Sequence, residues 1–207
     1  HVAERVFNDY FKAADYEYLI RNSEDTKITQ FETIDSAVSY ARALFGAEGG
    51  EWTFTQGSSD DPDVLNYSVA KGNVRVGSFT LVKSGKESEK LKLPIYTLGK
   101  TEIKLTPKYG ANIYAPINAI VKINGVALGE EFRYGDPVVL EEDVYFPEGD
   151  ESARTMQNYF VNGLYLEPDV AVTSSDGSVT YTLKYDPQTV VWRADEDYVN
   201  RLVADYN

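Results

Sequence analysis

The stretch from Ile113 to Leu128, IYAPINAIVKINGVAL, decides how the surrounding chain folds. Apolar residues alternate along Ala119–Ile123, stop at Asn124–Gly125 and resume along Val126–Leu128. A two-residue type I′ turn needs positive φ at both central positions, which asparagine and glycine tolerate. The stretch therefore predicts a β-hairpin that turns at Asn124–Gly125.

Further alternating segments predict strands on both sides of this hairpin. The expected strands before it are 52–54, 65–69, 74–76, 79–81, 95–98 and 102–106, and those after it are 138–140, 144–146, 159–161, 170–173, 179–184 and 190–192. Asp176–Gly177 marks a second tight turn. The change of phase at Gly77–Ser78 is typical of a β-bulge. Nearly all connections are short, as in a sandwich or a small barrel.

Three segments show helical spacing of apolar residues instead. Val2–Asp15 predicts an amphipathic helix at the N-terminus. Thr33 is a suitable N-cap for a second helix, which Gly46 would end. Asp195 would cap a C-terminal helix, in which Tyr198, Leu202 and related positions share one face.

These segments predict an α+β chain, with helices and strands first and mostly strands later. Ser84–Lys92, SGKESEKLK, is charged and low in bulky side chains, so it is the best candidate for a linker, although a long hairpin tip would have the same composition. We therefore expect an α+β domain at residues 1–92. A mostly β domain at 93–193 and the C-terminal helix at 194–207 would follow.

The first part of the chain resembles the nuclear-transport-factor-2-like (cystatin-like) fold. The segments that carry the resemblance are VFNDYFKAADYEYLI, IDSAVSYARALFG and the strands from Trp52 to Val82. In that fold a curved sheet and helices often enclose an apolar pocket. The expected lining residues are Tyr10, Phe11, Phe45, Trp52, Phe54 and Phe79. The alternative is that these aromatic side chains simply fill the core.

The second part is similar to extracellular modules of Firmicutes membrane-anchored proteins related to teicoplanin-resistance-associated proteins. The segments concerned are NIYAPINAIVKINGVAL and YFVNGLYLEPDVAVTSSDGSVTYTL. The sequence departs from those proteins in having no zinc ribbon and no transmembrane helix. The resemblance implies a non-catalytic module at the cell surface. Because the sequence begins at His1 and not at Met, we interpret it as part of an exported parent, anchored by a segment outside these residues.

The charge and the rarest residues exclude several functions. The 20 basic and 33 acidic residues give a net charge of −13, which disfavours nucleic acid and anionic membrane surfaces. With no cysteine, the chain cannot form a disulfide or use a thiolate. His1 is the sole histidine, so we do not expect a catalytic triad or a histidine metal site. We expect no cofactor, and a cationic peptide or protein or a cell-wall glycan as partner.

Carboxylates and tryptophans are the remaining candidates for chemistry. Asp60, Asp61 and Asp63 share one turn, where oxygen ligands would suit calcium, although a solvated turn has the same pattern. The acidic residues of 141–151 would serve glycoside hydrolysis only if paired with a carboxylate from another segment. Trp52 and Trp192 would suit sugar stacking, but both positions equally favour core packing.

Together these observations predict a non-catalytic binding or spacer module of the cell envelope. The alternative is a small enzyme of the lyase or isomerase type that uses a pocket in the first domain. A polar group that points into a deep cleft would favour the enzyme, and a filled core would favour the module.

Overall fold

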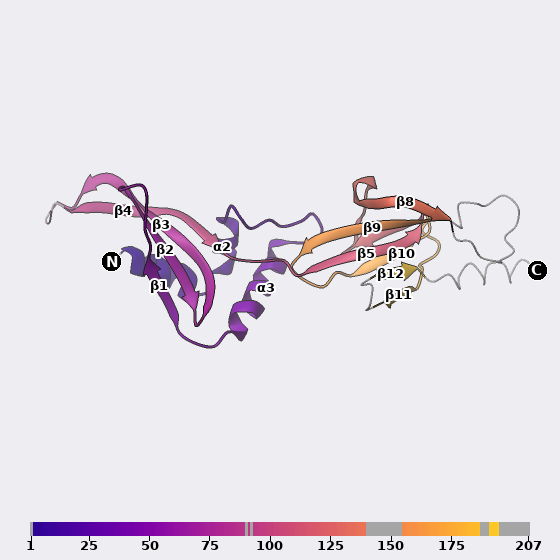
Figure 1. Ribbon diagram of the computed structural model, residues 1–207, viewed down its shortest axis with the longest axis horizontal. Helices are drawn as coiled ribbons and strands as arrows, with labels where there is room; N and C mark the ends of the chain where they lie inside the picture. The colour runs from indigo at the N-terminus through magenta and orange to yellow at the C-terminus, as the bar shows by residue number, and fades with distance from the viewer. Residues whose placement is uncertain (1, 90, 92, 140–154, 187–190, 195–207) are drawn as a thin grey trace, which may run out of the picture. The chain divides into compact units, whose positions relative to one another are not determined.

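The computed structural model describes residues 2–89, 91, 93–139, 155–186 and 191–194. It divides into two compact units (Figure 1), which we call unit 1, His1–Pro107, and unit 2, Lys108–Asn207. The division falls after Pro107, and the expected division after residue 92 lies inside unit 1. None of the helices in the described part is long and apolar enough to cross a membrane.

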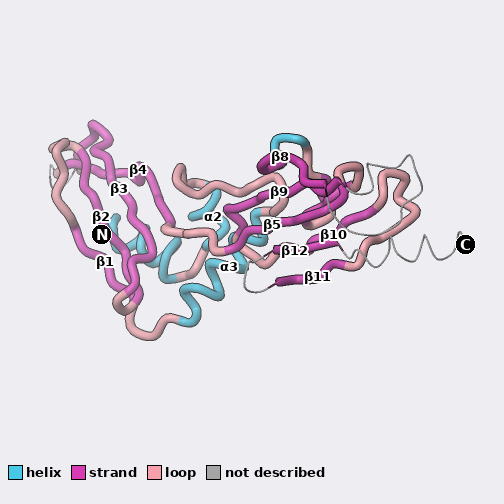
Figure 2. The backbone as a smooth tube through the Cα atoms, turned by 45° about the vertical axis from the view of Figure 1, so that its right-hand side comes forward, coloured by secondary structure: helices cyan, strands magenta, loops and turns pink. Residues whose placement is uncertain are grey.

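Unit 1 begins with short helical segments that lie beside its sheet (Figure 2). These segments are α1 (Val2–Val6), the π-helix η1 (Phe7–Lys12), α2 (Tyr16–Arg21) and the longer α3 (Ile34–Ala47). Ala14 has a φ of 57°, so the backbone turns there and the N-terminal helix cannot continue into α2. Asp15 caps α2 through its side chain, which accepts a hydrogen bond from the amide of Tyr18 at 3.2 Å.

The sheet of unit 1 is antiparallel and has the order β1-β2-β3-β4. Its strands are β1 (Trp52–Gln56), β2 (Val64–Lys71), β3 (Val74–Glu87) and β4 (Pro94–Ile103). Between β2 and β3 the pairing shifts by one residue, because Val69 faces Gly77 while Ala70 faces Arg75. The shift leaves Val76 as the extra residue, directly beside the Gly77–Ser78 position at which the sequence predicted a bulge.

The core of unit 1 lies between this sheet and the helical segments. Phe11 of η1 packs on Phe79 of β3, with ring centroids 5.9 Å apart, and both are fully buried. Phe7 packs on Phe54 of β1 at 4.7 Å. Burial of large aromatic side chains contributes several kcal/mol in total, so these contacts hold η1 on the sheet.

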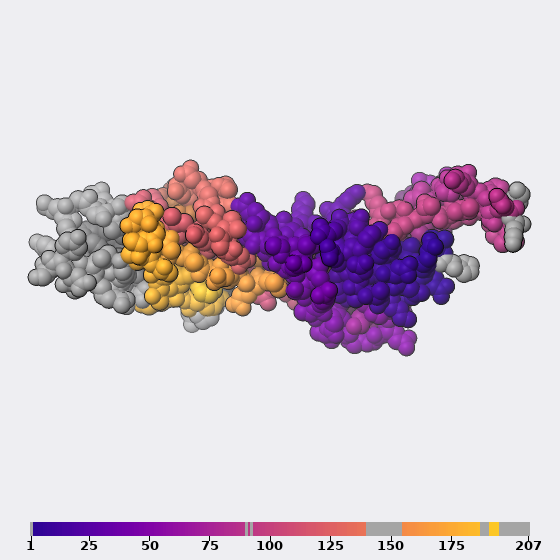
Figure 3. All heavy atoms as spheres, turned by 180° about the vertical axis from the view of Figure 1, so that it is seen from behind, coloured from indigo at the N-terminus to yellow at the C-terminus, as the bar shows by residue number. Residues whose placement is uncertain are grey.

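The described residues of Ser84–Lys92 lie at the end of the long hairpin formed by β3 and β4. Glu87 pairs with Pro94, and the amide of Ser88 donates to the carbonyl of Leu93 at 2.8 Å. Figure 3 shows the end of this hairpin as an arm that projects beyond the rest of unit 1. The charged segment is thus a hairpin tip, the second of the two possibilities that its composition allowed.

Unit 2 contains two sheets among its described residues. The larger has the order β11-β12-β5-β9-β8, and the smaller has the order β10-β6-β7. The strands are β5 (Tyr109–Pro116), β6 (Ile120–Ile123), β7 (Val126–Ala127), β8 (Arg133–Val139), β9 (Thr155–Leu164), β10 (Val170–Thr173), β11 (Leu183–Asp186) and β12 (Val191–Ala194), and the 3-10 turn η2 (Glu130–Phe132) precedes β8. All neighbouring pairs are antiparallel except β12 with β5.

The predicted hairpin at Asn124–Gly125 is confirmed. Asn124 and Gly125 have φ angles of 50° and 81°, and Ile123 of β6 pairs directly with Val126 of β7. These are the two positive φ angles that a type I′ turn requires. The opening stretch begins in β5 and continues through β6 and β7, so it contributes to both sheets of unit 2.

The expected α+β class is wrong, because the chain is mostly β. The described residues form three sheets, whereas α3 is the only described helix longer than six residues. The apolar stripe at the N-terminus predicted a helix over Val2–Asp15, and α1 with η1 forms a continuous helical segment over 2–12 that ends before the turn at Ala14. The expected nuclear-transport-factor-2-like domain at 1–92 was part of this α+β class, so it is wrong as well. The predicted strand at 144–146 and the predicted C-terminal helix lie outside the described residues, apart from Ala194, which ends β12.

Candidate functional site

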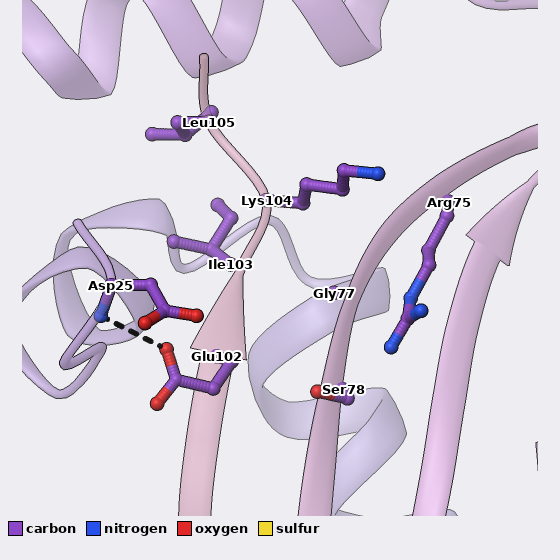
Figure 4. Close-up of a pocket in the computed structure, with 8 residues that line it drawn as sticks. All are labelled: Asp25, Arg75, Gly77, Ser78, Glu102, Ile103, Lys104 and Leu105. Carbon is purple, nitrogen blue, oxygen red and sulfur yellow. Dashed lines mark hydrogen bonds between the residues drawn. The ribbon is translucent and has the colours of Figure 1, made fainter.

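A pocket of about 280 Å³ lies in unit 1, where the end of β4 meets the start of β3. Charged side chains of both signs dominate its wall (Figure 4). Its lining residues are Asp25, Arg75, Gly77, Ser78, Glu102, Ile103, Lys104 and Leu105.

Strand pairing brings the two sides of this pocket together. Gly77 pairs with Ile103 and Ser78 pairs with Glu102, while the amide of Lys104 donates to the carbonyl of Val76 at 2.8 Å. A Cβ atom at Gly77 would overlap the carbonyl oxygen of Glu102. Glycine is therefore needed there for the close approach of the two strands.

The acidic side of the pocket is used to hold a loop. The Glu102 carboxylate accepts hydrogen bonds from Ser23 Oγ at 2.5 Å and from the amides of Glu24 and Asp25 at 3.3 and 3.4 Å. Figure 4 shows the last of these bonds. Ser23 is only 8% exposed, and its Oγ also accepts from Thr26 Oγ1 at 3.1 Å. Glu102 thus fastens residues 23–26 to the end of β4.

A surface ion pair lies beside this loop. Lys100 Nζ lies 2.8 Å from Glu24 Oε1 and Oε2. The hydrogen bond and the charge of Glu24 raise the pKa of Lys100, and the carboxylates of Glu102 and Asp25 add to this effect. Lys100 therefore stays protonated and partly balances the acidic loop.

The basic side of the pocket is formed by Arg75 and Lys104. Their side chains lie across the pocket from Asp25 and Glu102 (Figure 4). Within the described part of the chain, neither forms an ion pair. With the hydroxyl of Ser78 beside them, they offer a place for a carboxylate or another small anion.

The six aromatic residues predicted to line a pocket lie in and around the core of unit 1. Phe11, Phe45 and Phe79 are fully buried. Phe54 contacts Phe79, with centroids 6.3 Å apart, and Tyr10 stacks on Tyr18 at 4.1 Å. The pocket in Figure 4 has none of these six residues in its wall.

Trp52, the sixth of these aromatic residues, is half-buried at the start of β1. Lys71 lies opposite it in the strand pairing, and Lys71 Nζ is 5.7 Å from the centroid of the indole ring. The same Nζ donates to the carbonyl of Phe45 at 2.8 Å, at the end of α3. The Trp52 ring therefore packs within unit 1 beside the Lys71 ammonium group, which also donates a hydrogen bond to α3.

Asp60, Asp61 and Asp63 lie in the exposed turn between β1 and β2. Asp61 Oδ1 accepts from the amide of Asp63 at 2.9 Å, and Asp63 forms an ion pair with Lys83 at 3.2 Å. In the described ranges no group of three or more acidic or histidine side chains is placed to hold a metal ion. The structure thus does not gather these three carboxylates as calcium ligands.

Sequence reasoning missed the pocket residues Arg75, Glu102 and Lys104. Glu102 was assigned to a strand, and nothing near it in sequence shows that it meets Ser23, which lies 79 residues earlier. The local sequence gives little signal, because Glu102 alternates with Lys100 and Lys104 as an ordinary solvated strand face would.

Comparison with known proteins gives one weak likeness. No model of a known protein family matches the chain, and no solved structure matches it. Pectate lyase 1 of Cryptomeria japonica is 26% identical to it over 167 residues, which cover 72% of this chain and 42% of the lyase. The chain therefore spans less than half the length of that relative.

Proposed function

We propose that the chain is a non-catalytic binding or spacer module of an exported protein of the bacterial cell envelope. The observation that carries the proposal is the state of Glu102, the half-buried carboxylate of the pocket. It accepts three hydrogen bonds from the loop at 23–26, two at Oε2 and one at Oε1, so most of its acceptor sites serve the fold. A general base needs a lone pair that faces the substrate.

The filled core of unit 1 supports the same proposal. Phe11, Phe45 and Phe79 pack against neighbouring aromatic rings and leave their side chains buried. A ligand pocket at this place would need these rings to be partly uncovered. The placement at the cell surface rests on the resemblance of the IYAPINAIVKINGVAL stretch to extracellular modules.

The net charges of the two units indicate which partners we propose. Unit 1 has 13 basic and 16 acidic residues, a net charge of −3, whereas unit 2 has 7 basic and 17 acidic residues, a net charge of −10. Such an excess of negative charge attracts cationic peptides or proteins and repels polyanions. An uncharged region of cell-wall glycan is compatible with the same surface.

A lyase that uses the unit 1 pocket is the second candidate. The similarity to pectate lyase 1 favours it, and Arg75 and Lys104 would hold the carboxylate of an acidic sugar. The net charge of −13 opposes it, because pectate is a polyanion. Glu102 also opposes it, because most of its acceptor sites are taken by the loop at 23–26.

The proposal is tested by measuring binding to purified cell-wall glycan and to a lysine-rich peptide at low and high salt. We expect binding to at least one of them, with peptide binding weakened by salt because exposed charges are screened beyond about 8 Å at physiological ionic strength. The absence of binding to both, combined with turnover of pectate that the variant Arg75→Ala abolishes, would replace the module with the lyase.

A further inference from the structure

The outer face of the larger sheet in unit 2 carries an alternation of amide and aromatic side chains. On β5, Ala111, Ile113 and Ala115 are buried, and the residues between them point to the opposite face. On β9, Gln157, Tyr159 and Val161 are buried in the same way. The residues between them form the outer face, and they are Asn112, Tyr114, Asn158 and Phe160.

Strand register places these four residues in a two-by-two block. Asn112 lies opposite Phe160, and Tyr114 lies opposite Asn158, so each amide has an aromatic ring across the ladder and another along its own strand. Tyr134 of β8 pairs with Asn158 and extends the block by one strand. We call Asn112, Tyr114, Tyr134, Asn158 and Phe160 the amide–aromatic face.

Two rings of the amide–aromatic face are open to solvent. Phe160 is 46% exposed and Tyr134 is 66% exposed, and their ring centroids are 6.1 Å apart at an angle of 51°. On the other side of the block, Arg193 of β12 lies over the ring of Tyr114, with its Cζ 5.3 Å from the centroid. Tyr114 is thus covered on one side, and the exposed platform lies at Phe160 and Tyr134.

The two amides of the face have oxygen atoms without donors. Asn112 Oδ1 and Asn158 Oδ1 are shielded from solvent, and no hydrogen bond reaches either of them. A buried carbonyl oxygen without a donor costs about 1–3 kcal/mol. Both amides lie beside rings of the face in the strand register, so a ligand hydroxyl would need a ring to rotate aside before it could donate to these oxygens.

We propose that the amide–aromatic face binds an uncharged saccharide chain, an inference that rests on the proposed binding function and names its ligand class. Aromatic rings stack on the apolar faces of sugars, and sugar hydroxyls donate to amide oxygens. The net charge of −10 on unit 2 opposes a polyanionic glycan. The five residues of the face are uncharged, and the charged group beside them is the cation Arg193 over Tyr114, so the face offers a cationic peptide no carboxylate partner.

The test uses the full chain and N-acetylglucosamine hexamer, an uncharged saccharide, in isothermal titration calorimetry. Phe160→Ala should weaken binding about tenfold, which corresponds to the loss of one aromatic contact. Tyr185→Ala is the matched control, because Tyr185 is 47% exposed but packs at a tilt against Trp192 of the neighbouring strand β12 and is not part of the amide–aromatic face. The control should bind like the natural chain, and equal effects of the two variants would overturn the proposal.

A second variant separates binding from folding. Asn158→Leu keeps the size of the side chain and removes the oxygen that lacks a donor, so thermal stability should not fall. Saccharide affinity should fall with this variant, because the ligand loses its acceptor. Unchanged affinity in Asn158→Leu would contradict the role of the amide.

The remaining outcomes distinguish this inference from the broader function. Binding of lysine-rich peptide alone would overturn the saccharide inference and leave the binding module standing. Binding of polygalacturonate in preference to the hexamer would overturn the claim that the ligand is an uncharged saccharide. Self-association that Phe160→Ala abolishes would assign the face to a second copy of the chain. Binding of no probe at all would contradict both proposals.

Discussion

Gly125 is the residue at which the hairpin of unit 2 depends most directly on backbone conformation. Its φ is 81°, and open space surrounds the position of a Cβ atom, so a side chain there would meet backbone strain and no collision. Gly125→Val should lower stability by more than about 1 kcal/mol, because a β-branched residue resists positive φ. Thermal unfolding measures the change.

Gly57 provides the matched control for this substitution. It also has open space around its Cβ position, but its φ lies outside the positive range. Gly57→Val should therefore unfold close to the natural chain. Equal unfolding temperatures for the two variants would mean that the Asn124–Gly125 turn does not constrain unit 2.

Among the described residues, Asp176 has the clearest dependence on pH. Its Oδ1 accepts from Ser174 Oγ at 2.5 Å, from Ser178 Oγ at 2.7 Å and from the amide of Ser178 at 3.0 Å. These bonds favour the charged form and lower the pKa of Asp176 from 3.8 to about 2. The stabilisation is therefore complete above the unfolded pKa and is lost as pH falls through about 2.

Nuclear magnetic resonance titration of the Asp176 carboxyl tests this directly. We expect its midpoint well below that of an aspartate in a short peptide. Removing Ser178 Oγ in the variant Ser178→Ala should move the midpoint upward. A midpoint near 3.8 in the natural chain would show that the turn at 174–179 does not hold the carboxylate.

Some sites could be predicted because neighbouring residues alone determine them, whereas others depend on residues that are distant in sequence. Asn124–Gly125 and Asp176–Gly177 set their turns through their own φ angles, so neighbouring sequence was sufficient. Glu102 acquires its role from Ser23, which is distant in sequence. The amide–aromatic face likewise requires the pairing of β5 with β9, which alternation within one strand does not specify.

The loop at 23–26 is the element whose position depends on a single side chain. Glu102→Ala would leave Ser23 Oγ and the amides of Glu24 and Asp25 without their acceptor. Hydrogen bonds to a charged group contribute about 1.5–3 kcal/mol, so we expect a loss of stability in that range. Hydrogen exchange of the amides at 24 and 25 should also become faster.

Lys100→Ala is the control for this prediction. Lys100 contacts Glu24 in the same loop, but the pair is exposed to solvent and is screened. Its removal should change stability and amide exchange little. An equal effect of Lys100→Ala and Glu102→Ala would show that charge alone, and not the carboxylate geometry, holds the loop.

Alternation located most of the described strands and helical spacing located α3, because both patterns lie within a single segment. The N-terminal stripe predicted a helix over Val2–Asp15, and α1 with η1 covers 2–12 of it, but the π-helical geometry of η1 and the following α2 were not predicted. Phe7 and Phe11 of η1 pack on the sheet, and spacing along the chain does not show this tertiary contact. Ser84–Lys92 was ambiguous because linkers and hairpin tips are both solvated and rich in charge.

At the scale of the whole molecule, the division after Pro107 predicts two separable folding units. The fragments 1–107 and 108–207 should each give dispersed amide spectra and a cooperative unfolding transition, because each contains its own sheet and buried residues. Fragments divided after residue 92 are the control. The fragment 1–92 should be unfolded, because that division removes β4 from its pairing with β3.

The central claim is that the chain binds a cell-envelope component without transforming it. Co-sedimentation of the full chain with purified cell-wall glycan, followed by analysis of soluble saccharide, tests it most directly. We predict that the chain sediments with the glycan, that Phe160→Ala remains in the supernatant, and that no saccharide is released. Release of saccharide by the natural chain, abolished by Arg75→Ala or Glu102→Ala, would contradict the account.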